Sequence, residues 1–311
     1  MNYYNTEEKD CQDFVKHEEK ILTKLAIKKS QNAKIIDFLH SENDHERANR
    51  VEECGTFVGI TNVEGQAKII KSNFCRERIC AVCAWRRQSK FVAQMLPVIN
   101  YLSNDYEFIF VTLTIANMCY DELRNAIDNL LTGYQKLVKR RAYKRSWKGV
   151  CRSLELTYNA KSKTFHPHIH CLIAVKSNYF SGSNEDYISH ERLKYDWQDV
   201  MNLDYEPVVD IKKVVEEDNY NATIETLKYA LKPTYEIEAL KSFLYILKGR
   251  RLVSFTGVFA KTRKLFKYTD FELKLNDDID NKKVGNKEYN LYKFDITGGV
   301  YSFYKRLELI Y

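Results

Sequence analysis

The chain has 311 residues, of which 44% are hydrophobic, so it can bury one large core or two smaller ones. No apolar run approaches the roughly 18 residues that a membrane helix needs, and the polar start MNYYNTEEKDCQDF excludes a signal peptide, so we expect a cytoplasmic protein. The net charge of +7 is modest, but the cations cluster in residues 75–90 and 135–148 together with Trp85, Tyr143 and Trp147, which indicates contact with nucleic acid.

Polar residues 1–50 predict a helix and a charged loop, and residues 51–95 carry the clustered cysteines. Further along, the pattern predicts strands at 106–115, 149–159, 165–175 and 206–214, and helices at 119–144, 190–202 and 220–232. The tail, 236–311, mixes helical and strand-like segments. This order fits an antiparallel sheet covered by helices, so we expect the α+β class.

Four of the eight cysteines are clustered, namely Cys54, Cys75, Cys80 and Cys83. Without a secretion signal, a disulfide framework is not expected. The spacing of the last three is a partial zinc pattern, and a closed structural site needs a fourth ligand, for which Cys54 is the best candidate and His45 a weaker one. We expect zinc to fix a basic, DNA-facing module that includes Arg86 and Arg87; a small core of reduced thiols is the alternative.

The segment KTFHPHIHCLIAV places three histidines at alternate positions of a predicted strand. Alternate side chains share one face of a strand, so His168 and His170 are a suitable pair of metal ligands, and His166 can share their face. A hairpin to strand 149–159 would bring Glu155 beside them as the third ligand. The carboxylate favours Mg²⁺ or Mn²⁺, although the pattern does not exclude Zn²⁺ or a plain surface histidine cluster.

Glu225 and Tyr229 lie one helical turn apart in IETLKYALK, flanked by Lys228 and Lys232. A tyrosine with its ordinary pKa of about 10 is a poor nucleophile unless a base or a cation helps it. Glu225 is a candidate general base, and the two lysines are candidates for binding phosphate. Because the chain has 22 tyrosines, this pattern alone leaves a structural role for Tyr229 open.

Three of these segments resemble, in the same order, the motifs of one family. FVTLTIAN (110–117) is similar to its first motif, HPHIH (166–170) to its metal-binding second motif, and ETLKYALK (225–232) to its third, which carries a nucleophilic tyrosine and a glutamate one turn earlier. The chain thus resembles the HUH endonucleases, and within them the replication initiator (Rep) proteins of rolling-circle plasmids from Gram-positive bacteria.

The likeness extends over roughly residues 50–265, because the cysteine segment 73–90 and LVSFTGVFAK (252–261) are also similar to that subfamily. One departure is Ala81-Val82, where the family often has proline. The resemblance implies a ferredoxin- or RRM-like HUH core at 101–235. Before it we expect an N-terminal extension (1–50) and a zinc module (51–100), and after it a C-terminal region (236–311) packed on the core.

The resemblance also implies a reaction. Tyr229 would nick one strand of a plasmid double-strand origin, with a catalytic Mg²⁺ or Mn²⁺ held by His168, His170 and Glu155, and Glu225 would later activate water for termination. The implied DNA contacts come from cations and one histidine, namely Lys228, Lys232, Arg86, Arg87, Lys139, Arg140, Arg141 and His166.

The implied partners are single-stranded or supercoiled origin DNA, a host helicase and polymerase, and a second copy of the chain in a homodimer, all in the bacterial cytoplasm. Three alternatives stay open. One is an HUH transposase or mobilisation relaxase with the same chemistry. Another is a zinc-containing DNA-binding regulator without catalysis, which would leave the histidine strand unexplained. The third is a metallohydrolase acting on a small molecule, which would not need the basic segment or Tyr229.

Overall fold

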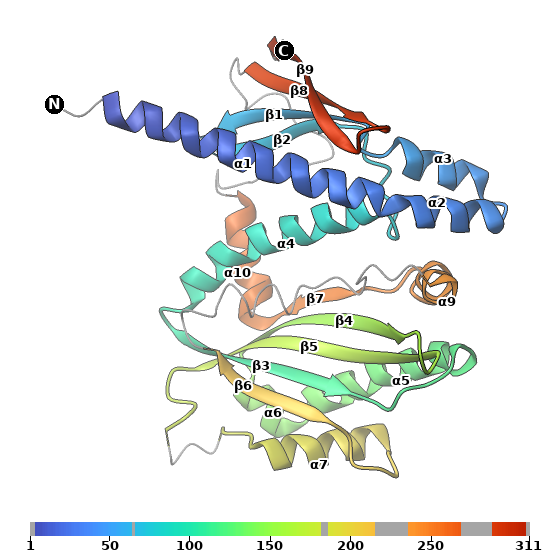
Figure 1. The fold of residues 1–311 in the computed structure, drawn as a ribbon. Helices are drawn as coiled ribbons and strands as arrows, with labels where there is room; N and C mark the ends of the chain where they lie inside the picture. Colours follow the sequence, from blue (N-terminus) through green and yellow to red (C-terminus); the bar gives the residue numbers. More distant parts are fainter. Residues whose placement is uncertain (1–3, 64–65, 182–185, 215–235, 269–287, 309–311) are drawn as a thin grey trace. The chain divides into compact units, whose positions relative to one another are not determined.

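The computed structural model describes residues 4–63, 66–181, 186–214, 236–268 and 288–308. The chain divides into two compact units, one formed by Met1–Arg86 with Lys274–Tyr311 and the other by Arg87–Leu273 (Figure 1). None of the described helices is long and apolar enough to cross a membrane.

The first unit combines helices with a four-stranded antiparallel sheet in the order β2-β1-β8-β9. Its helices are α1 (Tyr4–Ser30), α2 (Asn32–Ser41) and α3 (His45–Glu53), and its strands are β1 (Phe57–Val63), β2 (Gln66–Ser72), β8 (Glu288–Asp295) and β9 (Val300–Glu308). Helix α4 (Ala81–Leu102) begins in this unit and ends in the second. The apolar residues Leu25, Phe38, Leu39 and Ile60 are buried and form part of its core.

The second unit is built on a five-stranded antiparallel sheet in the order β6-β3-β5-β4-β7. Its strands are β3 (Tyr106–Thr114), β4 (Gly149–Asn159), β5 (Thr164–Lys176), β6 (Val209–Val214) and β7 (Val253–Thr256). Its helices are α5 (Tyr120–Lys139), α6 (Arg141–Ser146), α7 (His190–Met201), α9 (Ile237–Lys241), the π-helix η2 (Ser242–Ile246) and α10 (Gly257–Tyr268).

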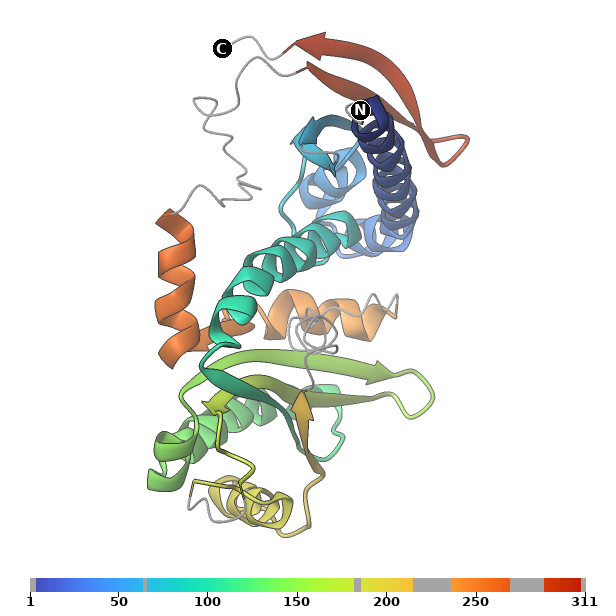
Figure 2. The ribbon, with the colours of Figure 1, turned by 90° about the vertical axis from the view of Figure 1, so that its left-hand side faces the viewer.

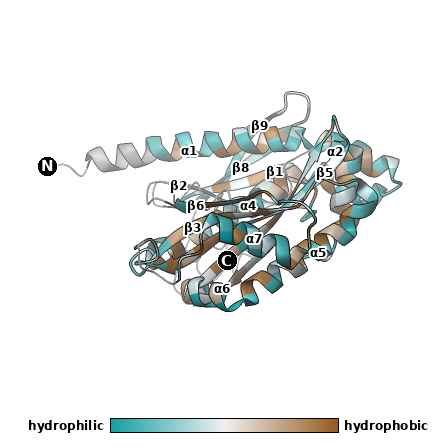
Figure 3. Ribbon diagram, turned by 90° about the horizontal axis from the view of Figure 1, so that it is seen from below, coloured by the Kyte–Doolittle hydropathy of each residue, from teal (hydrophilic) through white to brown (hydrophobic). Residues whose placement is uncertain are grey.

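Helices cover both faces of this five-stranded sheet. In Figures 1 and 2, α10 and the end of α4 lie on one face, and α5, α6 and α7 lie on the other. On the first face, Phe108, Leu172 and Phe259 belong to a buried apolar cluster. On the second, α5 and α7 carry both hydrophobic and hydrophilic stretches, as helices with one buried side do (Figure 3). The central strands are therefore held rigidly between two layers.

Gly257 allows the chain to turn from β7 into α10 beside β4. Its φ is +55°, and a Cβ at this position would lie 2.0 Å from the carbonyl oxygen of Lys148. Only glycine fits this close approach without moving the backbone. The glycine in segment 252–261 is therefore explained by the backbone conformation and close packing at this turn.

The predicted α+β class with an antiparallel sheet and covering helices is confirmed. The hairpin of strands 149–159 and 165–175 is observed as β4 and β5, and the other predicted strands are shifted by a few residues at most. The predicted helix 220–232 lies outside the described residues. The four-part domain division stays a prediction. Of the tail strands, β8 pairs with β1 and β9 pairs with β8, so both join the sheet of the first unit rather than forming a separate sheet.

Candidate metal centres

Strand register brings Glu155, His168 and His170 together. Glu155 on β4 is paired directly with His168 on β5, and Ser153 is paired with His170. Because side chains alternate along a strand, all three donor side chains lie on the same face of the sheet. On the other side of β5, Thr112 of β3 is paired with His170. The three candidate ligands therefore lie on the central strand β5 and its neighbour β4.

The three side chains converge on one carboxylate oxygen. Nε2 of His170 lies 2.9 Å from Oε2 of Glu155, and Nε2 of His168 lies 3.2 Å from the same atom. All three are nearly inaccessible, with exposed fractions of 1% for Glu155, 8% for His168 and 7% for His170. One ligand atom from each lies within 4.8 Å of the others, which is compact enough for a single metal ion.

The hydrogen bonds around His168 favour a cation at this point. Its Nδ1 lies 3.1 Å from the carbonyl oxygen of His166, which can only accept, so Nδ1 carries the proton. In a neutral ring, Nε2 is then an acceptor, yet it faces the acceptor oxygen of Glu155. A second proton or a metal ion between them is needed to make this contact favourable. Such a hydrogen bond behind a ligating histidine is the usual way in which proteins orient it.

The electrostatics keep Glu155 ionised. Burial alone would raise the pKa of its carboxyl group, but hydrogen bonds from His168 and His170 outweigh burial and hold the pKa well below its ordinary value. Thr112 supports the other ring, because its Oγ1 lies 3.1 Å from Nδ1 of His170, and Phe110 stacks on that ring. An ionised carboxylate with two oriented imidazoles suits several divalent cations.

His166 occupies the flank of this cluster. Its ring centroid lies 5.2 Å from that of His168, and the side chain is half-buried. Burial, followed by the charge of His168, lowers its pKa. It is not among the residues whose ligand atoms group together. The role predicted for it, a contact to DNA, stays a prediction.

The four clustered cysteines converge in the first unit. Their sulfurs are separated by 3.5 Å for Cys54 and Cys83, 3.7 Å for Cys75 and Cys83, and 3.6 Å for Cys80 and Cys54. These distances are far longer than a disulfide bond of about 2.05 Å. They match the roughly 3.8 Å edge of a tetrahedron of sulfurs around zinc at about 2.3 Å. Cys54, rather than His45, is the fourth member of the group.

The four thiols are close enough together to share one cation. Hydrogen bonds with the other three thiols, together with burial, raise the pKa of the Cys54 thiol. Four thiolates at these distances would repel one another strongly unless a positive ion lay between them. The donor set therefore fits a zinc ion with four protein ligands.

Sequence reasoning missed Asn32, which supports this cluster from α2. Its buried side chain donates from Nδ2 to the sulfur of Cys80 at 3.3 Å and accepts at Oδ1 from the amide of Ala81 at 2.8 Å, at the start of α4. Lys29, also buried, donates to the carbonyl oxygen of Glu52 near the cluster. Both residues lie in the N-terminal region that resembles no known motif, so no local pattern could have identified them.

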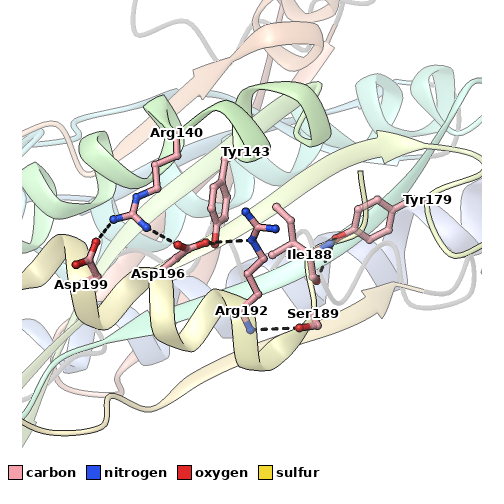
Figure 4. Close-up of polar contacts among 8 residues, drawn as sticks. All are labelled: Arg140, Tyr143, Tyr179, Ile188, Ser189, Arg192, Asp196 and Asp199. Carbon is pink, nitrogen blue, oxygen red and sulfur yellow. Dashed lines mark hydrogen bonds and ion pairs between the residues drawn. The ribbon is translucent and has the colours of Figure 1, made fainter. Parts of the chain in front are cut away.

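Some of the residues predicted to contact DNA have other partners. Arg140 forms ion pairs with Asp196 and Asp199 of α7 (Figure 4). The aromatic side chains of Tyr143 and Trp147, which were grouped with these cations as a sign of nucleic-acid contact, are buried in the structure. In the sequence, a basic segment with aromatics looks the same whether its aromatic side faces solvent or the sheet.

Lys139 and Arg141 are exposed at the junction of α5 and α6, where they can meet a phosphate backbone. Arg86 and Arg87 lie on α4, with Arg86 4.0 Å from the centre of the Phe74 ring. The predicted site residues of the third motif lie outside the described part of the chain, namely Glu225, Lys228, Tyr229 and Lys232. Their roles stay predictions.

Comparison with known proteins identifies the family. A family model described as "Replication protein" matches residues 66–301. "Protein rep" of Streptococcus pneumoniae serotype 2 (strain D39 / NCTC 7466) is 33% identical over 252 residues, covering 76% of this chain and 79% of the relative. "Protein rep" of Staphylococcus aureus is 34% identical over 227 residues, covering 71% of this chain and 98% of the relative.

"Protein rep" of Bacillus amyloliquefaciens is 30% identical over 280 residues, covering 79% of this chain and 82% of the relative. No solved structure matches the chain significantly. The matched region includes the histidine strand, three of the four clustered cysteines and the third motif. The chain therefore belongs to the replication protein family, the Rep proteins of rolling-circle plasmids that its motifs resemble.

Proposed function

We propose that this plasmid replication initiator nicks one strand of its double-strand origin by attack of Tyr229 on a phosphodiester. The convergence of His168, His170 and Glu155 on a rigid sheet, in a chain of the Rep family, carries the proposal. A DNA-binding protein without catalysis would have no use for a buried histidine–carboxylate cluster on its sheet. The third motif supplies the nucleophile that the cluster lacks.

In the proposed reaction, the phenol oxygen of Tyr229 forms a bond to phosphorus as the bond from phosphorus to the 3′ oxygen breaks. The phenol gives up its proton, and the departing 3′ oxygen takes one up. The products are a 5′-phosphotyrosine and a free 3′-OH that can prime synthesis. A divalent cation held by the cluster, Mg²⁺ or Mn²⁺ for a carboxylate and phosphate oxygens, would polarise the scissile phosphate.

The protein's own groups fix the geometry of this step. The carbonyl of His166 and the hydroxyl of Thr112 hold the two imidazoles so that both Nε2 atoms face Glu155. The paired strands keep these groups from moving as charge develops on the phosphate. Glu225, one turn from Tyr229, would activate water in the final cleavage and so release the enzyme from DNA.

DNA would be held mainly through its phosphates, by Lys139 and Arg141 on the second unit and by Lys228 and Lys232 beside the nucleophile. Contacts of this kind release counterions, so binding should weaken steeply as salt rises. The four cysteines would hold zinc in a structural site, because four protein ligands leave no position for substrate.

The experiment uses a labelled single-stranded oligonucleotide from the origin of the replicon that encodes the chain, with Mn²⁺ or Mg²⁺, on a denaturing gel. We expect a covalent protein–DNA band that disappears in Tyr229→Phe. The matched control is Tyr195→Phe, because Tyr195 is an exposed tyrosine on α7 that we expect to be dispensable. Glu225→Ala should still form the band but should fail to hydrolyse it.

Cleavage by the wild-type protein without any covalent band would contradict the proposal, and so would an unchanged band in Tyr229→Phe. If His170→Ala still formed the band, attack by the tyrosine would not need the histidine cluster, and the role proposed for the metal would be wrong.

A further inference from the structure

The second unit contains a cavity that the proposed reaction does not use. It has a volume of about 700 Å³ and lies where α5 and α6 face β4 and β7. Val150 and Arg152 of β4 line it, whereas Glu155 is an odd number of residues further along the same strand. Because alternate residues point to opposite faces, the cavity is on the opposite face of the sheet from the histidine cluster.

Two segments singled out by the sequence meet at this cavity. The basic segment 135–148 contributes Lys144 and Trp147, and the segment 252–261 contributes Ser254 and Thr256. Neither contribution has a role in the proposed nicking reaction. The cavity therefore joins features that the metal centres leave unexplained.

Positive charge dominates the described residues that line the cavity. These residues include Lys144, Arg152, Arg250 and Arg251, and the described lining contains no Asp or Glu. Arg250 forms an ion pair with Asp128, which offsets its charge. The others leave an excess of positive charge around a partly enclosed space, which favours an anion.

Arg152 makes the strongest case for a ligand. Its exposed fraction is 6%, yet its partners in the described part of the chain are neutral. Nε donates to Oγ of Ser254 at 3.1 Å, Nη2 donates to the carbonyl oxygen of Arg251 at 3.1 Å, and the guanidinium lies 5.6 Å from the centre of the Tyr134 ring. Nη1 is buried and has no hydrogen-bond partner among the described residues. A buried cation without a counter-charge is costly, and a bound anion would offset that cost.

Trp147 adds a second donor to the lining. Its exposed fraction is 8%, and its indole N–H, which is buried, finds no acceptor in the described ranges. The ring packs edge-on against Tyr143, with 4.9 Å between the centroids. A buried indole nitrogen normally has a hydrogen-bond partner, so this donor is also available for a ligand.

The wall that carries these groups is held in place. The hydroxyl of Tyr143 donates to Asp196 at 3.0 Å, and Arg140 bridges the same aspartate and Asp199 (Figure 4). On the opposite wall, Arg152 is paired with Ser254 in the register of β4 and β7. Such prior ordering lowers the entropy cost of binding a ligand.

We propose that this cavity binds a nucleotide, with its phosphate at Arg152 and Lys144 and its base against the apolar side chains of the wall. Guanidinium groups match the geometry of phosphate, so we expect the anion to be a phosphate group. The volume exceeds that needed for inorganic phosphate and falls in the range of about 300–1,000 Å³ typical of small-molecule sites. Leu131, Val138 and Val150 supply apolar surface for a base.

The nucleotide can be free or can be part of a DNA strand, and the proposal does not depend on nicking by Tyr229. The test measures binding of fluorescently labelled dTMP and of a short single-stranded oligonucleotide, each with unlabelled dTMP and inorganic phosphate as competitors. Tight dTMP binding identifies a free nucleotide. Oligonucleotide binding that depends on Arg152 and resists dTMP identifies a nucleotide within DNA.

The variants are Arg152→Met and Lys144→Gln, with Lys264→Gln, an exposed lysine of α10, as the matched control. We expect Arg152→Met to weaken binding at least tenfold, about the effect of losing a charge-assisted hydrogen bond. Lys144→Gln should weaken it less, and Lys264→Gln should not change it. The melting temperature without ligand should be equal or higher in Arg152→Met, since a buried cation is replaced by an apolar side chain.

Binding that is the same in Arg152→Met and the wild type would overturn the proposal, as would no binding of either probe. A lower melting temperature in Arg152→Met without any effect of ligand would assign Arg152 a structural role instead. Inorganic phosphate that competes as well as dTMP would overturn the choice of a nucleotide.

Discussion

The cysteine cluster and the histidine cluster both gather metal-binding donor atoms, but they do so from different kinds of structural element. The cysteines come from the end of α3 (Cys54), the following loop (Cys75) and the start of α4 (Cys80 and Cys83), and their four sulfurs surround one point. Glu155, His168 and His170 come from two adjacent strands and approach one point from a single face of a sheet. The first arrangement offers four donors, as many as a tetrahedral metal takes, and the second offers three.

This difference in the number of donors is the basis for proposing a structural role for the cysteines and a chemical role for the histidines. A closed site gives its binding energy to folding, whereas an open site can accept a phosphate oxygen. The hydrogen bonds that support the two clusters also differ. Asn32 ties the cysteine cluster to the start of α4, but Thr112 and the His166 carbonyl orient rings toward the open site.

Removing a cysteine should give the largest effect on folding. We expect Cys80→Ser to lose most of its zinc and to expose the first unit to proteases, because structural zinc supplies about 10 kcal/mol or more of folding free energy in isolated zinc fingers. Elemental analysis and limited proteolysis measure both effects. Cys119→Ser, which changes an exposed cysteine, is the control. If Cys80→Ser kept its full zinc content, the cysteine cluster would not be the zinc site, and its contrast with the histidine cluster would fail.

Removing a histidine ligand should affect activity without affecting the fold. We expect His170→Ala to slow covalent adduct formation about a thousandfold, since a metal that polarises phosphate contributes several kcal/mol to the barrier. Its zinc content and circular dichroism should match the wild type. His190→Ala changes a histidine at the start of α7 and serves as the control. Loss of zinc from His170→Ala would mean that the two sites are not separate.

Changing Asn32 should weaken the closed site while keeping its ligands. Asn32→Asp keeps an oxygen acceptor for the amide of Ala81 but removes the donor to the sulfur of Cys80. We expect zinc affinity to fall about 10- to 100-fold in a chelator competition, with adduct formation unchanged when zinc is saturating. Asn43→Asp, at an exposed turn of the same unit, should behave as the wild type. Equal zinc affinity in the two variants would remove the role of Asn32.

Changing Thr112 should give the smallest effect. We expect Thr112→Val to need about tenfold more Mn²⁺ for half-maximal adduct formation, with little change at saturating Mn²⁺, because the variant loses a hydrogen bond that orients His170. Thr112→Ser restores the hydroxyl and should restore the Mn²⁺ requirement. A lower rate at saturating Mn²⁺ would instead indicate a direct role of Thr112 in the reaction.

The sequence predicted the parts of the molecule in which a short pattern decides the structure. The alternation in HPHIHCLIAV and the short turn before it were enough to predict Glu155 beside the histidines, and the structure pairs it with His168. The cysteine spacing left one ligand open, and the choice of Cys54 agrees with the observed grouping. Local patterns of this kind depend on strand geometry and on ligand spacing, both of which are visible in a single segment.

The rest depends on contacts between distant segments. Asn32 reaches Cys80 across 48 positions, and Arg152 reaches Ser254 across 102. The basic segment 135–148 could not show which of its faces packs on the sheet, so the burial of Tyr143 and Trp147 was missed. The cavity beside Arg152 could not be predicted for the same reason. Distant segments form its two walls, and neither segment carries a known ligand-binding motif.

The most direct test of two separate metal centres is a brief EDTA treatment, followed by zinc analysis and the adduct assay on the same sample. The account predicts that about one zinc per chain remains, that adduct formation is lost, and that Mn²⁺ alone restores it. Adduct formation that persists after EDTA, or that returns only when zinc is added, would contradict it.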